Sequence, residues 1–85
     1  MARYRIEVKK SAVRELGSIP KRDLRLVVAR IRSLADDPRT PGSKKLAAQE
    51  KYRIRQGRYR ILYTIEDEVL IVYVVKIAHR RNVYR

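Results

Sequence analysis

Polar and apolar residues follow two different periods along this 85-residue chain, and the changes of period mark its elements. Tyr4, Ile6 and Val8 alternate with charged residues, which predicts a half-buried strand near the N-terminus. Two segments with helical spacing follow, and Pro20 falls in the first turn of the second. The stripe of the second helix is the most regular in the chain and consists of Leu24, Val27, Val28, Ile31 and Leu34.

The first helix is short, and its apolar positions are Ala12, Leu16 and Ile19. Ser11 is the expected N-cap, because its hydroxyl can accept a hydrogen bond from the first turn. Gly17 can end the helix in a left-handed conformation. After the second helix, residues 38–50 show no regular period, and we expect an irregular loop there.

A two-residue period returns at residues 51–63, which read Lys-Tyr-Arg-Ile-Arg-Gln-Gly-Arg-Tyr-Arg-Ile-Leu-Tyr. A turn at 56–58 divides this segment into the two strands of a hairpin. One face of the hairpin is apolar and carries Tyr52, Ile54, Tyr59, Ile61, Tyr63 and Ile65. The other face carries Arg53, Arg55 and Arg60. Cross-strand neighbours lie only about 5 Å apart, so these like charges destabilise the hairpin, and a bound polyanion would offset that cost.

An acidic turn at 66–68 precedes residues 69–77, which are apolar at nearly every position. A strand that is apolar on both faces belongs inside a sheet. Helices can cover one face, but the other needs a partner or the chain's own end. The order is strand, helical hairpin, then a three-stranded antiparallel meander. It predicts a single α+β domain over 1–85, with the helices packed on one face of the sheet.

Charge is the dominant feature of the composition, because the chain has 22 Lys and Arg residues and only 9 Asp and Glu residues, which gives a net charge of +13. Such an excess indicates a polyanionic partner: nucleic acid, an anionic membrane surface or an acidic protein. The chain has no cysteine, no run long enough to span a membrane and no N-terminal apolar segment, so we expect a cytoplasmic protein. The absence of cysteine and the single histidine argue against a zinc site, and we expect no metal and no cofactor.

The segment Tyr-Arg-Ile-Arg-x-Gly-x-Tyr-Arg-Ile-x-Tyr is followed by the acidic turn, the apolar strand and a final His-Arg-x-x-Val-Tyr. This combination resembles the RelE/ParE superfamily of bacterial and archaeal toxins, and within it the RelE branch. The resemblance covers essentially the whole chain. It implies a type II toxin that cleaves mRNA in the ribosomal A site, without metal, by attack of a 2′-hydroxyl on the phosphodiester. It also implies an acidic, RelB-like antitoxin, with DNA bound only through the toxin–antitoxin complex.

The RelE-type active site is a set of basic residues with one tyrosine. Matched by motif, its positions in this chain are Arg53, Arg55, Arg60, Arg80 and Tyr84. Arginines stabilise charge on phosphate but do not exchange protons, so the resemblance leaves His79 and Tyr84 as candidates for proton transfer. Some relatives have lysine where Arg53 and Arg55 stand here. If a lysine accepts the proton in those relatives, another group must do so in this protein. Residues predicted to contact RNA or the ribosome are Lys44, Lys45, Arg58 and Arg81.

Two other functions remain open on the sequence alone. The ParE branch has the same scaffold but inhibits DNA gyrase through protein contacts, and its members generally lack the full basic set. A non-catalytic RNA-binding module would bind RNA in a strongly salt-dependent way and would cleave nothing.

Overall fold

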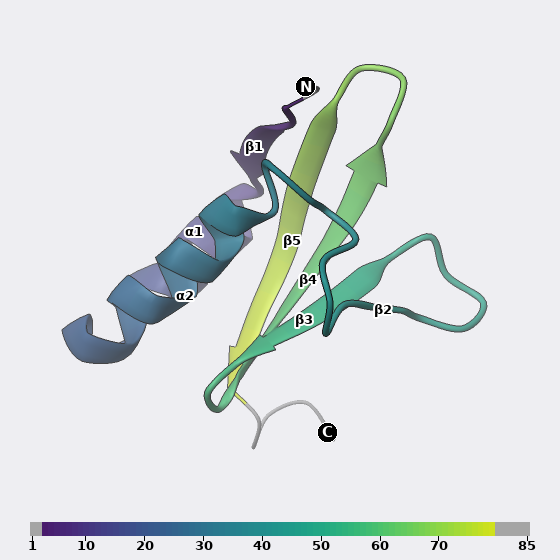
Figure 1. Ribbon diagram of the computed structural model, residues 1–85. Helices are drawn as coiled ribbons and strands as arrows, with labels where there is room; N and C mark the ends of the chain where they lie inside the picture. Colours follow the sequence, from purple (N-terminus) through teal and green to yellow (C-terminus); the bar gives the residue numbers. More distant parts are fainter. Residues whose placement is uncertain (1–2, 80–85) are drawn as a thin grey trace.

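Two helices lie on one side of a five-stranded sheet in the computed structural model, which describes residues 3–79 (Figure 1). The elements are β1 (Arg5–Val8), α1 (Lys10–Gly17), α2 (Lys21–Ser33), β2 (Lys44–Lys45), β3 (Tyr52–Gln56), β4 (Tyr59–Glu66) and β5 (Ile71–His79). The strand order is β1-β5-β4-β3-β2. β1 runs parallel to β5, and the other neighbours are antiparallel. The predicted α+β class, with a helical pair before a three-stranded meander, is confirmed.

Two of the strands extend the meander in ways that the sequence pattern did not predict. β1 pairs with β5, with Ile6 opposite Val72, so the apolar side of the N-terminal strand joins the core. β2 is a two-residue strand inside the segment expected to be an irregular loop, and it pairs with β3. The sheet therefore ends in a short strand on either side of the meander.

The start of α1 differs from the prediction. The helix begins at Lys10 with Lys9 as its N-cap, so Ser11 lies inside the first turn and does not cap it. The backbone N–H of Lys9 donates to the carbonyl of Val74 at 2.8 Å. This bond ties the end of β1 to β5, and the chain therefore turns into the helix before Ser11 is reached.

The end of α1 also differs. Gly17 is the last helical residue and does not adopt the predicted left-handed conformation; the glycines with positive φ within residues 3–79 are Gly42 and Gly57. Ser18 closes the helix in a right-handed conformation, with its hydroxyl donating to the carbonyl of Glu15 at 2.9 Å. Pro20 is the N-cap of α2, one position earlier than predicted.

The core lies between the helical pair and the apolar face of the sheet. Tyr63 is completely buried there, and its hydroxyl donates to the carbonyl of Pro38 at 2.7 Å. Tyr52 and Tyr59 pack against the same core, as the alternation predicted. The buried core residues are Ala12, Ile19, Val27, Ile31, Leu34, Ile54, Ile61, Tyr63, Val72, Val74 and Ile77. Within residues 3–79, neither helix is long and apolar enough to cross a membrane.

A β-bulge in β5 decides which side chains face the helices. Tyr63 pairs with Val74, whereas the residue before Tyr63 in β4 pairs with Lys76, so Val75 is the additional residue. A bulge reverses the alternation that follows it. Val74 and Ile77 are therefore both buried in the core, although an odd number of positions separates them.

Candidate nucleic-acid interface

The sheet face that points away from the helices carries the predicted arginines. Arg55 of β3 pairs directly with Arg60 of β4, and Arg53 pairs with Leu62. Directly opposed residues project from the same face of an antiparallel pair, with Cβ atoms about 4.5–5.5 Å apart. Arg53, Arg55 and Arg60 therefore form one cluster, which we call the arginine face. The sequence prediction that these three side chains share a face is confirmed by this register.

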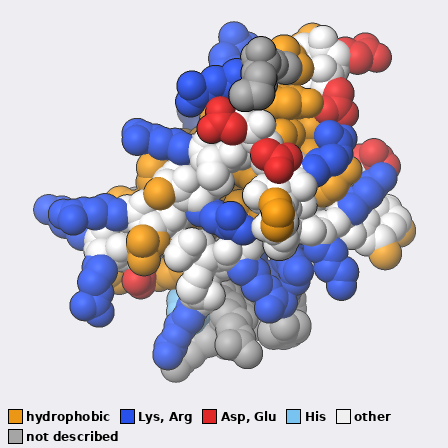
Figure 2. All heavy atoms as spheres, in the orientation of Figure 1, with side chains coloured by type: hydrophobic (Ala, Val, Ile, Leu, Met, Phe, Trp, Pro, Cys, Tyr) orange, Lys and Arg blue, Asp and Glu red, His pale blue; other side chains and the backbone are white. Residues whose placement is uncertain are grey.

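The arginine face is partly fixed against the sheet. Arg53 and Arg60 are half-buried, and the Nε atom of each is removed from solvent, whereas Arg55 is exposed. On the side of the molecule seen in Figure 2, Lys and Arg side chains are spread over most of the surface, and the carboxylates lie mostly in the upper part of the view. A planar guanidinium can donate two parallel hydrogen bonds to a phosphate, so this cluster suits a phosphodiester.

Strand β2 brings one of the two predicted lysines to the arginine face. Lys44 pairs with Arg53 and projects from the same side. Lys45 pairs with Tyr52 on the other side, and its ammonium group forms an ion pair with Glu50 at 3.4 Å. The structure therefore separates Lys45 from the arginines, although the two lysines are neighbours in the sequence.

The hairpin tip adds Arg58 to the same region. Gly57, with φ of +59°, is the first of the two loop residues, and a positive φ there is what the primed hairpin turns require. A shallow hollow of about 40 Å³ at the tip is lined by Arg55, Gly57, Arg58, Tyr59 and Arg60. Three of the five lining residues are cationic, so the hollow can accept an anionic oxygen group.

His79 lies on the opposite side of the sheet from the arginine face. Arg60 pairs with Ala78, and the next residue, His79, pairs with Tyr59 on the helix side. The imidazole meets the Tyr59 ring edge to face, with centroids 5.2 Å apart and planes at 87°. Sequence reasoning included His79 among the proton-transfer candidates of the basic cluster, and the strand register places it away from that cluster.

The surroundings of His79 form a separate pair of hollows on the helix side. One, of about 320 Å³, includes Glu15, Lys76 and His79; the other, of about 510 Å³, includes Asp23 and His79. Both are lined by Tyr59, whose pKa is raised, first by burial and then by Asp23. Lys76 pairs with Leu62 in the sheet, but its ammonium donates to Glu15 at 2.9 Å and is directed to α1.

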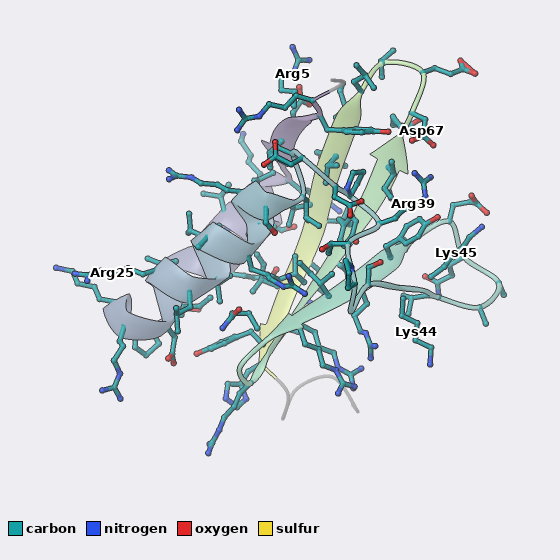
Figure 3. All side chains as sticks on the ribbon, in the orientation of Figure 1. Arg5, Arg25, Arg39, Lys44, Lys45 and Asp67 are labelled. Atoms are coloured by element: carbon teal, nitrogen blue, oxygen red, sulfur yellow. The ribbon has the colours of Figure 1, made fainter. Side chains whose placement is uncertain are left out.

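Sequence reasoning missed Arg39, which holds the loop before β2. Its guanidinium donates to both carboxylate oxygens of Asp67, at 3.1 and 2.9 Å, and lies 5.5 Å from the centre of the Tyr52 ring (Figure 3). The Tyr4 hydroxyl donates to the same carboxylate at 2.6 Å. The hydrogen bonds from Arg39 and then Tyr4 lower the pKa of Asp67 to about 2. No local sequence signal joins Arg39 to Asp67, because 28 positions separate them.

The remaining predicted site residues, Arg80, Arg81 and Tyr84, lie outside the described residues. Within residues 3–79, no group of three or more His, Cys, Asp or Glu side chains could hold a metal ion. The described part of the site can therefore bind and neutralise a polyanion through its guanidinium groups. Arginine stays protonated in proteins, so these groups can stabilise charge on phosphorus but cannot serve as the base.

Comparison with known proteins identifies relatives over nearly the whole chain. Residues 6–84 match the family described as ParE toxin of the type II toxin–antitoxin system parDE. The chain is 33% identical to toxin RelG of Mycobacterium tuberculosis over 86 residues, which cover 96% of this chain and 97% of that protein. A chain in the crystal structure of the RelBE2 toxin–antitoxin complex of M. tuberculosis superposes with a TM-score of 0.85 at 30% identity, covering 96% of this chain and 97% of the other. A chain in the archaeal RelE–RelB complex of Pyrococcus horikoshii OT3 superposes with a TM-score of 0.82 at 27% identity, covering 96% and 99%.

Proposed function

This chain belongs to the ParE toxin family of type II toxin–antitoxin systems and to the RelE branch of its superfamily, and we propose that it cleaves mRNA in the ribosomal A site. The observation that carries the proposal is the arginine face. Strands β3 and β4 place Arg55 directly opposite Arg60, and Arg53 lies two residues before Arg55 on the same face of β3. Negative charge bound between the guanidinium groups would offset the repulsion between these like charges.

The proposed reaction is a transesterification within the RNA strand. The 2′-oxygen of one nucleotide loses its proton and bonds to the adjacent phosphorus, while the bond to the 5′-oxygen of the next nucleotide breaks and that oxygen gains a proton. The products are a 2′,3′-cyclic phosphate and a 5′-hydroxyl. Negative charge on the phosphate oxygens grows in the transition state, and preorganised donors aimed at it typically contribute the largest part of catalysis.

Each residue of the arginine face has a defined task in this proposal. Arg55 and Arg60 hold the scissile phosphate between them, and Arg53 with Lys44 holds the backbone of a neighbouring nucleotide. Arg80 and Tyr84 enter through the family resemblance, Arg80 as a further cation and Tyr84 as the proton-transfer group. Cationic neighbours favour the ionised form of a phenol, which is the form that can accept a proton.

We expect cleavage to depend on the ribosome, because the arginine face does not orient the RNA strand for reaction. Guanidinium groups stabilise charge but do not align a 2′-oxygen with phosphorus, and a flexible RNA strand rarely adopts the in-line geometry by itself. Orientation alone can contribute about 7–11 kcal/mol to a reaction barrier. A ribosome that holds the A-site codon in a fixed path would provide that orientation, so we expect little cleavage of naked RNA.

The partner that restrains the toxin is proposed to be an acidic, RelB-like antitoxin. Similar chains in solved structures are present in complexes with RelB. The net charge of +13 favours a partner of opposite charge, both in rate of association and in specificity. A partly disordered acidic chain can cover a large surface of a small domain. In this proposal the pair contacts DNA only through the antitoxin.

The match to a family described as ParE toxin gives the gyrase-inhibiting alternative a specific observation in its favour. Toeprinting on translating ribosomes separates the functions: we expect the wild-type chain to cut mRNA in the A site and Arg60→Gln to lose most of that cleavage. Tyr84→Phe should abolish cleavage while ribosome binding persists. Arg32→Gln, an exposed cation on α2, is the matched control and should cleave normally.

Each contrary outcome has its own meaning. DNA breaks in cells without mRNA cleavage would replace the proposal with gyrase inhibition. Salt-dependent RNA binding without cleavage on translating ribosomes would replace it with a non-catalytic RNA-binding module. Unchanged cleavage by Tyr84→Phe would show that another group performs the proton transfer.

A further inference from the structure

The open face of the sheet continues beyond the arginine face into a short apolar strip. Leu62 of β4 lies in the same row as Arg53, and Tyr73 and Ile71 of β5 follow on the same side, opposite Thr64 and Glu66. All three apolar residues are half-buried, and none belongs to the core between the helices and the sheet. We call Leu62, Ile71 and Tyr73 the apolar strip.

Tyr73 differs from the other tyrosines of the described chain. Tyr4 and Tyr63 donate to Asp67 and Pro38, and the other two described tyrosines pack on the core and contact a charged or aromatic side chain. Within residues 3–79, no hydrogen bond or ring contact joins Tyr73 to another side chain. Its ring lies half-buried on the open face between Glu7 of β1 and Thr64 of β4, and its exposed part is an aromatic surface next to the arginine face.

The position of Tyr73 relative to the arginines matches the spacing of a nucleic-acid strand. Tyr73 lies opposite Thr64, which is four residues beyond Arg60 and two beyond Leu62 along β4. At about 3.4 Å per residue, the Tyr73 row lies about 14 Å from the Arg55–Arg60 row and about 7 Å from the Arg53 row. A single strand with one phosphate at Arg60 can bring a base one or two nucleotides away onto this ring.

We propose that Tyr73 is a base-stacking residue for single-stranded RNA, with Leu62 as the apolar edge of the same subsite. The proposal rests on the proposed function and names how a nucleotide flanking the scissile phosphate is held. The alternation of cations with an aromatic surface fits RNA, because a single strand presents phosphates and flat bases at a regular spacing. Arg53 and Lys44 would hold the backbone of this nucleotide while its base lies on the Tyr73 ring.

The test measures binding of a fluorescently labelled single-stranded RNA that carries 2′-O-methyl groups and cannot be cleaved by its own 2′-oxygen. Tyr73→Ala should weaken binding by about 5- to 150-fold, which corresponds to a stacking energy of about 1–3 kcal/mol per base. Tyr73→Phe keeps the ring and should bind within about twofold of wild type. Tyr73→Leu keeps apolar volume without an aromatic face and should bind as weakly as Tyr73→Ala, which protects the test if the alanine variant unfolds.

Salt dependence distinguishes stacking from a general disturbance of the face. Tyr73→Ala should leave the slope of log affinity against log salt unchanged, whereas Arg53→Gln should reduce its magnitude by roughly one, because a phosphate contact is lost. Val69→Ala, at an exposed apolar residue in the β4–β5 turn, is the control and should change neither affinity nor slope. Wild-type affinity in Tyr73→Ala, or equal affinities of the leucine and phenylalanine variants, would overturn the proposal.

Cleavage by wild type on ribosomes is measured in parallel, so that the two proposals can fail separately. If wild type cleaves and Tyr73→Ala retains its KM, its kcat and its RNA affinity, only the stacking proposal fails. If wild type never cleaves but Tyr73 still governs RNA affinity, the stacking residue stands and the nuclease proposal fails. Loss of acidic antitoxin binding with full RNA affinity in Tyr73→Ala would identify the strip as a protein-docking surface and overturn the stacking proposal.

Discussion

Removing one charge from the Arg55–Arg60 pair should make the protein more stable and less active at once. Arg55 is the better choice, because it is exposed whereas Arg60 is half-buried. Arg55→Gln keeps a shorter, uncharged polar side chain in β3 and ends the repulsion from the residue directly opposite. The same substitution removes a donor proposed to hold the scissile phosphate, so stability and activity should change in opposite directions.

The magnitude follows from the cross-strand geometry. The Cβ atoms of directly opposed residues lie up to about 5.5 Å apart, and two unit charges at that separation in a water-like dielectric repel by about 0.8 kcal/mol. The guanidinium groups end longer side chains that can diverge, so this value is an upper bound. For a domain of this size, 1 kcal/mol corresponds to roughly 4–8 °C in Tm, so Arg55→Gln should raise Tm by at most about 3–6 °C at low salt. Near 1 M salt the Debye length is about 3 Å, and the gain should shrink toward zero.

Thermal unfolding at low and high salt measures this effect, with Arg32→Gln as the control for a general reduction of the net charge. Arg32 lies in the last turn of α2 with no cation three or four positions away, and a cation there favours the helix dipole, so its substitution should not raise Tm and should lower it slightly. In a double-mutant cycle, Arg55→Gln should raise Tm less in the Arg60→Gln background than in wild type, because the repulsion can be removed only once. A lower Tm for Arg55→Gln at low salt, or additive gains, would refute the electrostatic reasoning. Cleavage by Arg55→Gln should fall by about 10²- to 10³-fold, the usual cost of one transition-state donor.

Four further substitutions test the fold that carries the arginine face. Tyr63→Phe should lower the free energy of unfolding by about 1–3 kcal/mol, because the buried carbonyl of Pro38 loses its donor; urea unfolding measures this. Asp67 has a pKa lowered to about 2, so its carboxylate stabilises the fold above its unfolded pKa near 3.9, and that contribution disappears as pH falls from about 4 to 2. Asp67→Asn should therefore unfold more easily than wild type at pH 7, with the difference in urea midpoint vanishing near pH 2. Gly57→Ala should cost about 1–2 kcal/mol, because φ is +59° although the space around it is open. Gly17→Ala, at an equally open position in α1, should instead stabilise the protein by about 0.5–1 kcal/mol.

Each of these has an outcome that would contradict it. Wild-type stability of Tyr63→Phe would mean that water satisfies the Pro38 carbonyl. A stability difference for Asp67→Asn that persists at pH 2 would show that the charge of the carboxylate is not what stabilises the fold. Equal effects at the two glycines would show that the left-handed conformation of Gly57 carries no cost.

The arginine face could be predicted from the sequence because it depends on local geometry alone. Successive side chains of a strand point to opposite faces, and a two-residue turn fixes which residues of the two strands lie opposite each other. These two rules together place Arg53, Arg55 and Arg60 on the same face. The core-facing tyrosines of the same hairpin followed from the same count. The stripe of α2 depends on helical periodicity and was likewise predictable.

Two features of the site could not be predicted because they depend on contacts between distant segments. The two-residue strand β2 forms only where β3 offers its edge, and this pairing selects Lys44 over Lys45. The loop before β2 is held by Arg39, whose partner Asp67 lies 28 positions further along the chain. No local pattern encodes such a pairing.

The sequence alone determined the α+β class, the helical pair, the meander and the gathering of three arginines, because periodicity and turn chemistry are properties of neighbouring residues. The tertiary structure decided which side chains of β5 face the helices and which face the open side of the sheet. Simple alternation would place Tyr73 and His79 on the same face, six positions apart. The bulge at Val75 reverses the alternation, so His79 packs on Tyr59 at the helix side and Tyr73 remains on the open face with the arginines. A bulge arises from how β4 and β5 fit against the core, and that fit exists only in the folded sheet.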